Sequence, residues 1–321
     1  MCSLTLQVKG LVNKMTKTIN AYKGITLRNI RVYLKDKTSI IMSLMAQIII
    51  LGLFLLFLKN NYTDSIIAQL GELRDLLSDN DINAIVNSYL MAGVIGTSVV
   101  TVALNSLSVM VSDRERKINF DYGASPVKGH TVVLSYFSGA VVNTFLVSAV
   151  LTTAGFIFLC IGSEITYTLL DFLKIYGLVA LGSISATLVL MVFASFFKKS
   201  STQGSFGVLV SAAIGFITGA YIPVSQFSES IQTGVNLVPA SQIAGMMKYV
   251  LITPTIDHAN DVLNGIDNGE FSKAMYQIFS VKMNIFGNEV DFGFMLMYSL
   301  IAIAVFLIIN LALYRFTSKN K

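Results

Sequence analysis

Residues 89–111 read YLMAGVIGTSVVTVALNSLSVMV and contain no Asp, Glu, Lys, Arg or His. A membrane-spanning α-helix needs about 20 mostly apolar residues, which this stretch supplies. Five similar stretches lie at 40–58, 131–161, 172–197, 206–222 and 292–316. Within their limits the only ionisable residues are Lys174 and Arg315, each near an end of its stretch. Because a charge at the bilayer centre costs about 2.5–3.5 kcal/mol, the sequence predicts an all-α polytopic membrane protein with six transmembrane helices. It also predicts a membrane interior without ionisable groups.

The composition supports a membrane protein and offers no enzyme site. Hydrophobic residues make up 54% of the chain and charged residues 13%, whereas soluble domains average about 25% charged residues. The two cysteines and two histidines have no spacing typical of a metal site. The chain also lacks a G-x-x-x-x-G-K-[ST] phosphate loop and any nucleophile–base arrangement. We therefore expect a non-enzymatic protein that binds no metal and no cofactor of its own.

The charges are sorted between two sides of the membrane. Basic residues concentrate in segments 1–38 and 112–130, at Lys198-Lys199 and in the C-terminal tail, while most acidic residues lie in the other loops. Since basic loops stay in the cytoplasm, both termini are expected there. The net charge of +5 then reflects topology and contact with anionic membrane lipids, and not nucleic-acid binding. No cleavable signal peptide is apparent, and the start at Met1 or Met15 stays open.

Residues 18–35 form an amphipathic pattern. Apolar residues recur at helical spacing, and Arg28, Arg31 and Lys35 fall on the opposite face. This pattern favours an interfacial helix on the cytoplasmic leaflet; the alternative is a cytoplasmic extension of the first span. The predicted division is a cytoplasmic N-terminus (1–38), a six-span transmembrane domain (39–316) and a cytoplasmic tail (317–321).

The chain between the fifth and sixth spans does not resemble a plain loop. Pro223 ends the fifth span, and a turn at Asn236–Pro239 precedes an apolar run at 243–253. A run of this length is too short to cross a bilayer and is typical of re-entrant segments. We therefore predict a re-entrant helical hairpin at 223–253, with Pro223, Asn236 and Pro239 at its gate, followed by an extracellular segment at 254–291.

Small and polar residues inside the spans have two interpretations. Ser211, Gly215 and Gly219 lie four residues apart and would let another helix approach closely, either at a subunit interface or gate or within the chain. The polar residues Gln47, Asn105 and Asn143 could line a substrate path, or could form interhelical hydrogen bonds.

The loop 112–130 carries dense alternating charge, from Asp113 to Lys117, and then aromatic and small residues. Taken alone, it is either a short helix that docks a partner or an ordinary positively charged cytoplasmic loop. The lack of energy-coupling residues elsewhere suggests that a partner supplies the energy.

Three segments resemble the type-2 ATP-binding-cassette (ABC) exporter permeases, the membrane subunits of many bacterial drug, peptide and polysaccharide exporters. Asp113–Lys117 with Gly123–Val127 is similar to the family's E-R-E-x-G…A-S-P-V run after the second span. The other two segments are Gly215–Pro223 with Phe227–Ile231, and Asn236–Gln242 leading to Leu251. The chain departs from the family where Ile118-Asn119 replace the usual Gly, and where Pro239 comes three residues after Asn236.

The resemblance implies a permease that works with two copies of a cytoplasmic ATPase subunit, which would hold the ATP and Mg. It also implies a second permease copy, identical or different, and a bacterial cell-membrane location. Segment 113–120 would be the coupling helix, with contacts from Asp113, Arg114, Glu115, Arg116, Lys117 and Phe120. The long segment 254–291 favours export of a drug, peptide or lipid-like substrate; the alternatives are a polysaccharide or teichoic-acid exporter, or a non-transporting immunity or sensory subunit.

Overall fold

The computed structural model describes residues 2–125, 127–161 and 167–319, so Met1, Pro126 and the end of the predicted tail lie outside it. Within the described residues, six helical segments are long and apolar enough to span a membrane, which confirms the predicted all-α polytopic fold. These segments run from Lys37 to Leu76, Asp79 to Glu115, Gly129 to Cys160, Leu169 to Phe196, Ser200 to Ile217 and Phe292 to Leu313.

The first two segments are built from several consecutive helices. The first comprises α2 (Lys37–Leu53), a π-helical turn η1 (Phe54–Leu58), α3 (Lys59–Leu70) and a 3-10 turn η2 (Gly71–Leu76). The second comprises α4 (Asp79–Ser106) and α5 (Ser108–Glu115). The other four are α7 (Gly129–Cys160), α8 (Leu169–Phe196), α9 (Ser200–Ile217) and α13 (Phe292–Lys319).

Helix α4 forms the centre of the bundle. It packs against α2, α7, α8, α9 and α11 (Pro239–Leu263). In the second segment, 89% of the 18-residue apolar stretch is buried within the chain, compared with 17% of the corresponding stretch in α9 and in α13. The glycines of α4 allow this close packing, because a Cβ at Gly96 would lie 3.0 Å from the Cβ of Ala244. Helices α9 and α13 therefore lie at the edge of the chain and α4 at its core.

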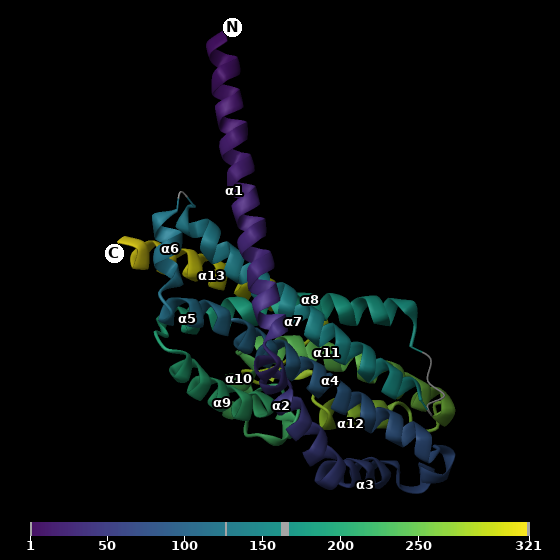
Figure 1. Ribbon diagram of the computed structural model, residues 1–321. Helices are drawn as coiled ribbons and strands as arrows, with labels where there is room; N and C mark the ends of the chain where they lie inside the picture. Colours follow the sequence, from purple (N-terminus) through teal and green to yellow (C-terminus); the bar gives the residue numbers. More distant parts are fainter. Residues whose placement is uncertain (1, 126, 162–166, 320–321) are drawn as a thin grey trace.

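The bundle has two distinct ends (Figure 1). The charged end holds α5, α6 (Ile118–Ala124) and the turn between α8 and α9. The hairpin end holds α3 and α12 (Glu270–Ile278). Helix α1 (Cys2–Lys35) runs across the direction of the spans and its N-terminal half stands clear of them (Figure 1).

The C-terminal half of α1 packs on α7. The hydroxyl groups of Tyr22 and Ser138 are 2.6 Å apart, and an added Cβ at Gly139 would lie 3.0 Å from the Cβ of Asn29. Helix α1 begins at Cys2, earlier than the predicted helix at 18–35. Nothing in the apolar periodicity of residues 2–17 signals this extension.

A bent helix pair lies between the fifth and sixth spans, as predicted. Helices α10 (Glu229–Asn236) and α11 meet at 96°, and the 3-10 turn η3 (Val224–Gln226) precedes them. Helix α11 continues past residue 253, although Pro254 removes one hydrogen bond within the helix. Beyond the proline, Ile256, Ala259 and Leu263 are fully buried, and this packing stabilises the last turns. Segment 254–291 therefore begins as a helix, followed by α12 and the antiparallel hairpin β1 (Met283–Ile285) and β2 (Asn288–Val290).

The close packing of α4 gives a first prediction. A Cβ at Gly93 would lie 2.8 Å from the Cβ of Ala220 and 3.1 Å from its Cα, so the backbone there would have to shift. We expect Gly93→Ala to lower the free energy of unfolding by about 1–3 kcal/mol, measured by circular dichroism at 222 nm during heating in detergent. Gly177→Ala in α8 is the control, because nothing lies within 4 Å of the added Cβ. Equal melting of the two variants would contradict this packing.

Candidate functional site

Asp113 lies buried at the charged end and joins three helices. Both of its carboxylate oxygens accept hydrogen bonds from the guanidinium group of Arg28 in α1, one of them at 2.8 Å. The hydroxyl group of Tyr136 in α7 donates a third bond at 2.6 Å. The hydrogen bond with Asp113 raises the pKa of Arg28, so the guanidinium group remains charged at physiological pH. Asp113 thus holds α1 and α7 against the end of α5.

Arg114 and Glu115 bind the turn between α8 and α9. The Nη1 atom of Arg114 donates to the carbonyl oxygens of Ala194 and Ser195, both at 3.1 Å, and to that of Phe197. These carbonyls lie at the C-terminal end of α8, where the last carbonyl groups of a helix lack a partner one turn ahead; that of Ala194 also accepts from the backbone amide of Phe197. Glu115 accepts hydrogen bonds from the backbone amide of Ser200, at 2.9 Å, and from its hydroxyl, at 2.5 Å, at the first turn of α9. A carboxylate is favourable at this position because it opposes the positive end of the helix dipole.

The outward-facing part of this loop is α6 and the turn before it. Arg116 and Lys117 are exposed, and the side chain of Phe120 is 66% exposed. Lys117 has a φ of 63°, a left-handed conformation that interrupts the helix between α5 and α6. The structure therefore differs from the single coupling helix expected over 113–120: Asp113, Arg114 and Glu115 hold the bundle together, and Arg116, Lys117 and Phe120 face outward.

A large groove runs along the bundle between α2, α4, α5 and α9. Its volume is about 1200 Å³ and most of its lining is apolar, including Met42, Met45 and Val208. Asp36 and Arg116 line it at the charged end, and Tyr221 lines it at the other end. Of the polar and small residues singled out in the sequence, Asn105 and Ser211 line this groove.

A family model described as "ABC-2 type transporter" matches residues 20–252. The chain belongs to the ABC-2 type transporter family. It is therefore the permease subunit of an ABC transporter, a multi-pass membrane protein whose family works with an ABC ATPase subunit. A search of the curated proteins found no match.

Two of the residues considered for a substrate path in this ABC-2 permease form links between helices instead of lining the groove. Gln47 is buried, and its side-chain amide forms a hydrogen bond of 3.0 Å with the hydroxyl of Thr101 in α4. Asn143 donates to the hydroxyl of Ser106 at 3.0 Å and joins α7 to α4. A polar group in an apolar surrounding needs such a partner.

The glycines of the fifth span pack within the chain. Gly215 lies against the ring of Tyr221, which leaves no room for a Cβ. Gly219 follows the end of α9 with a φ of 65°, a conformation that favours glycine. Both residues shape the tight turn that leads from α9 to Pro223.

The residues predicted at the gate hold the bent helix pair in shape. The side-chain amide of Asn236 donates to the carbonyl of Asn284 in β1 at 2.8 Å, and its Oδ1 accepts from the hydroxyl of Ser241 at 3.1 Å. Pro239 occupies the first turn of α11, where the missing N–H costs no hydrogen bond. Among the described residues, no three His, Cys, Asp or Glu side chains come together as a metal site would require.

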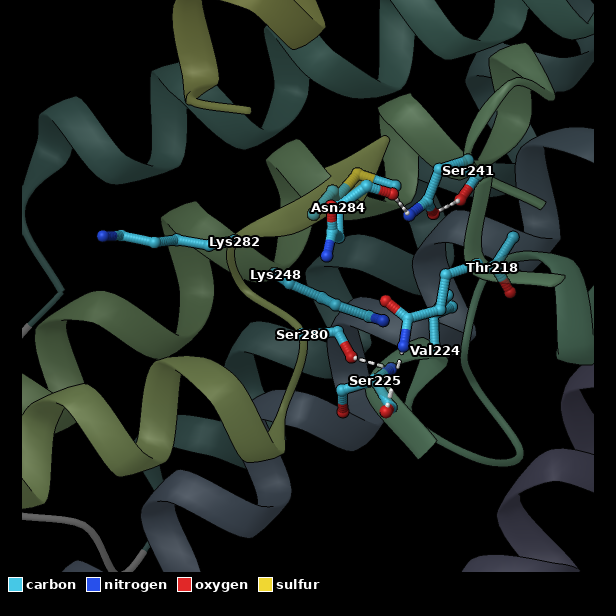
Figure 2. Close-up of a pocket in the computed structure, with 12 residues that line it drawn as sticks. Thr218, Val224, Ser225, Ser241, Lys248, Ser280, Lys282 and Asn284 are labelled. Carbon is cyan, nitrogen blue, oxygen red and sulfur yellow. Dashed lines mark hydrogen bonds between the residues drawn. The ribbon is translucent and has the colours of Figure 1, made fainter. Parts of the chain in front are cut away.

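The prediction of an interior without ionisable groups overlooked Lys248. Its side chain is 2% exposed, and its Nζ lies 5.3 Å from the centre of the Tyr89 ring of α4. Figure 2 shows it in a pocket between α11 and the segments around Val224 and Ser280. Lys248 lies in the apolar run at 243–253, outside the six long stretches. The only sequence signal for a buried lysine was a charged residue inside that short apolar run.

The Asp113 junction gives a second prediction. We expect Asp113→Asn to lower the free energy of unfolding by about 1.5–3 kcal/mol, because it weakens charge-assisted bonds to Arg28. It should also speed tryptic cleavage within α1. Thermal unfolding and limited proteolysis measure the two effects. Asp121→Asn on the exposed side of α6 is the control and should change neither; an equal effect of both variants would contradict the role of Asp113.

Proposed function

We propose that this permease belongs to a bacterial exporter that moves a drug, peptide or lipid-like substrate out of the cell, with ATP hydrolysed on a separate ATPase subunit. The observation that best supports this substrate class is the apolar groove between α2, α4, α5 and α9. A site of this size lined by aliphatic, methionine and aromatic side chains suits a lipophilic or amphipathic molecule. A sugar polymer would need many hydrogen-bonding groups along the path, which favours this class over polysaccharide export.

The charged end of the groove suits an amphipathic substrate. Asp36 and Arg116 place one acidic and one basic group at its rim. Hydrogen bonds from Ser39 lower the pKa of Asp36, so this carboxylate stays ionised at neutral pH. A polar headgroup could bind there while apolar chains lie along α2 and α9.

The open side of the groove suits a second permease copy. Only 28% of the 18-residue apolar stretch in the first span is buried within one chain, and only 17% of the corresponding stretch in α9. Two copies related by a twofold axis would bring the same surfaces face to face and enclose the substrate path between them. Whether the partner is identical or different does not change this geometry.

We place the ATPase at the charged end, which the positive-inside rule assigns to the cytoplasm. Helix α6, with Arg116 and Lys117 before it and Phe120 on its exposed side, is the part of the loop that could enter a groove on the partner. A push on α6 would reach α1, α8 and α9 through the hydrogen bonds of Asp113, Arg114 and Glu115. Two ATPases, one for each permease copy, would act in this way.

A change of charge on the exposed loop tests this placement. We expect Lys117→Glu combined with Phe120→Glu, two exposed residues that do not line the groove, to reduce co-purification of the ATPase and to abolish most of the permease-dependent change in ATP hydrolysis in liposomes. The matched control is Lys273→Glu in α12, an exposed lysine at the hairpin end. If the double variant folds stably, co-purifies with the ATPase and changes ATP hydrolysis as the unmodified chain does, the ATPase does not bind at α6.

Narrowing the groove tests the substrate path. We expect Ser211→Phe to reduce ATP-driven uptake of a lipophilic fluorescent cation into inverted vesicles several-fold, because the new ring would occupy the groove. Basal ATP hydrolysis should persist. Val150→Phe on the exposed face of α7 adds the same ring outside the groove and should have no effect. If both variants transport normally, the groove is not the path.

A further inference from the structure

Lys248 lies in a small pocket with a largely polar lining at the hairpin end, separate from the substrate groove. The pocket has a volume of about 20 Å³ and lies between α11, the turn after α9 and the segment that leads into β1. A water molecule needs roughly 10–15 Å³ by the same measure. The pocket therefore admits one particle of the size of a water molecule or a small ion, and no substrate.

The ammonium group of Lys248 has no counter-charge in the described part of the chain. No carboxylate oxygen there lies within 4.0 Å of its Nζ, and no hydrogen bond from Nζ is formed. Its one favourable partner is the face of the Tyr89 ring at 5.3 Å, an interaction that favours a cation over a neutral amine. A buried lysine without an anion beside it tends to lose its proton, so a bound anion would keep the ammonium group charged.

Two neutral polar side chains near this lysine, Ser280 and Asn284, can donate hydrogen bonds into the pocket. Figure 2 shows Lys248, Ser280 and Asn284 extending toward the same space. The hydroxyl oxygen of Ser280 accepts a bond from the backbone amide of Ser225 at 2.8 Å, which leaves its own O–H to donate. The side-chain amide of Asn284 makes no hydrogen bond to another described residue, and its Oδ1 atom is buried without a partner. An ammonium, a hydroxyl and an amide together form a donor set that an anion would complete.

The backbone around the pocket is shaped for the lysine. A Cβ at Gly219 would lie 2.6 Å from the Nζ atom, so a larger residue there would displace the end of the lysine. The carbonyl of Gly219 accepts a hydrogen bond from the hydroxyl of Tyr89, which fixes the turn against α4. Lys248 thus lies with its side chain inside the pocket and is 2% exposed.

We propose that this pocket binds a small monovalent anion, chloride or an ion of similar size, between Lys248, Ser280 and Asn284. The ion would neutralise the buried lysine and connect α11 with the turn after α9 and with the chain before β1. Tetrahedral anions such as phosphate and sulfate are too large. The proposal is independent of the transported substrate and of the ATPase, because it concerns the stability of the bent helix pair.

The test uses the purified full chain in dodecyl maltoside, heated while its helix content is followed at 222 nm. Sodium gluconate is replaced by sodium chloride or bromide at constant ionic strength. We expect the unfolding temperature to rise and saturate with chloride and bromide, and not with sulfate. Excess broadening of the 35Cl resonance by the same sample gives an independent measure of binding.

Variants separate this site from surface binding. Lys248→Met should abolish the chloride-dependent rise in unfolding temperature. Asn284→Leu should weaken chloride affinity about tenfold. The asparagine side chain makes no hydrogen bond to another described residue, so this variant breaks none. Lys282→Gln is the matched control, because Lys282 borders the same pocket but pairs with Glu289 at 3.4 Å. If Lys248→Met does not fold, Asn284→Leu carries the test. An equal chloride response in all variants, or none in the unmodified chain, would overturn the proposal.

Discussion

The close approach of α4 to its neighbours is the constraint on which the rest of this permease depends. Without water in the bilayer, helices associate through van der Waals packing and a few buried hydrogen bonds. Gly93 and Gly96 remove the side chains that would hold Ala220 and Ala244 away from α4. Gln47 and Asn143 then add hydrogen bonds to the same helix from α2 and α7. A displacement of α4 would therefore disturb the packing of α2, α7, α8, α9 and α11 together.

The same continuous segment connects the two ends of the molecule. At the charged end, α4 leads through α5 to Asp113, Arg114 and Glu115, which hold α1, α8 and α9. Toward the hairpin end, Tyr89 on α4 contacts the turn after α9 and faces Lys248 of α11. The segment formed by α4 and α5 thus contacts both the helices at the charged end and the bent helix pair.

Several features of the candidate site could be predicted from residue types and spacing. The charged loop after the second span, the bent helix pair and the family itself all follow from local sequence patterns, because charge density, short apolar runs and proline act within a few residues. The direction in which each charged residue points could not be predicted. Asp113 and Arg116 are equally polar in the sequence, yet one is buried against Arg28 and the other is exposed.

The sequence by itself determined that this chain crosses the membrane six times, because each apolar stretch must form a helix that satisfies its own backbone hydrogen bonds in lipid. It also determined where the bend between the fifth and sixth spans lies. Only the tertiary structure decided which polar residues face the groove and which link helices, since that depends on the rotation of each helix against its neighbours. The burial of Lys248 beside Tyr89 was decided in the same way, because those residues lie far apart in the chain and meet only when α11 packs on α4.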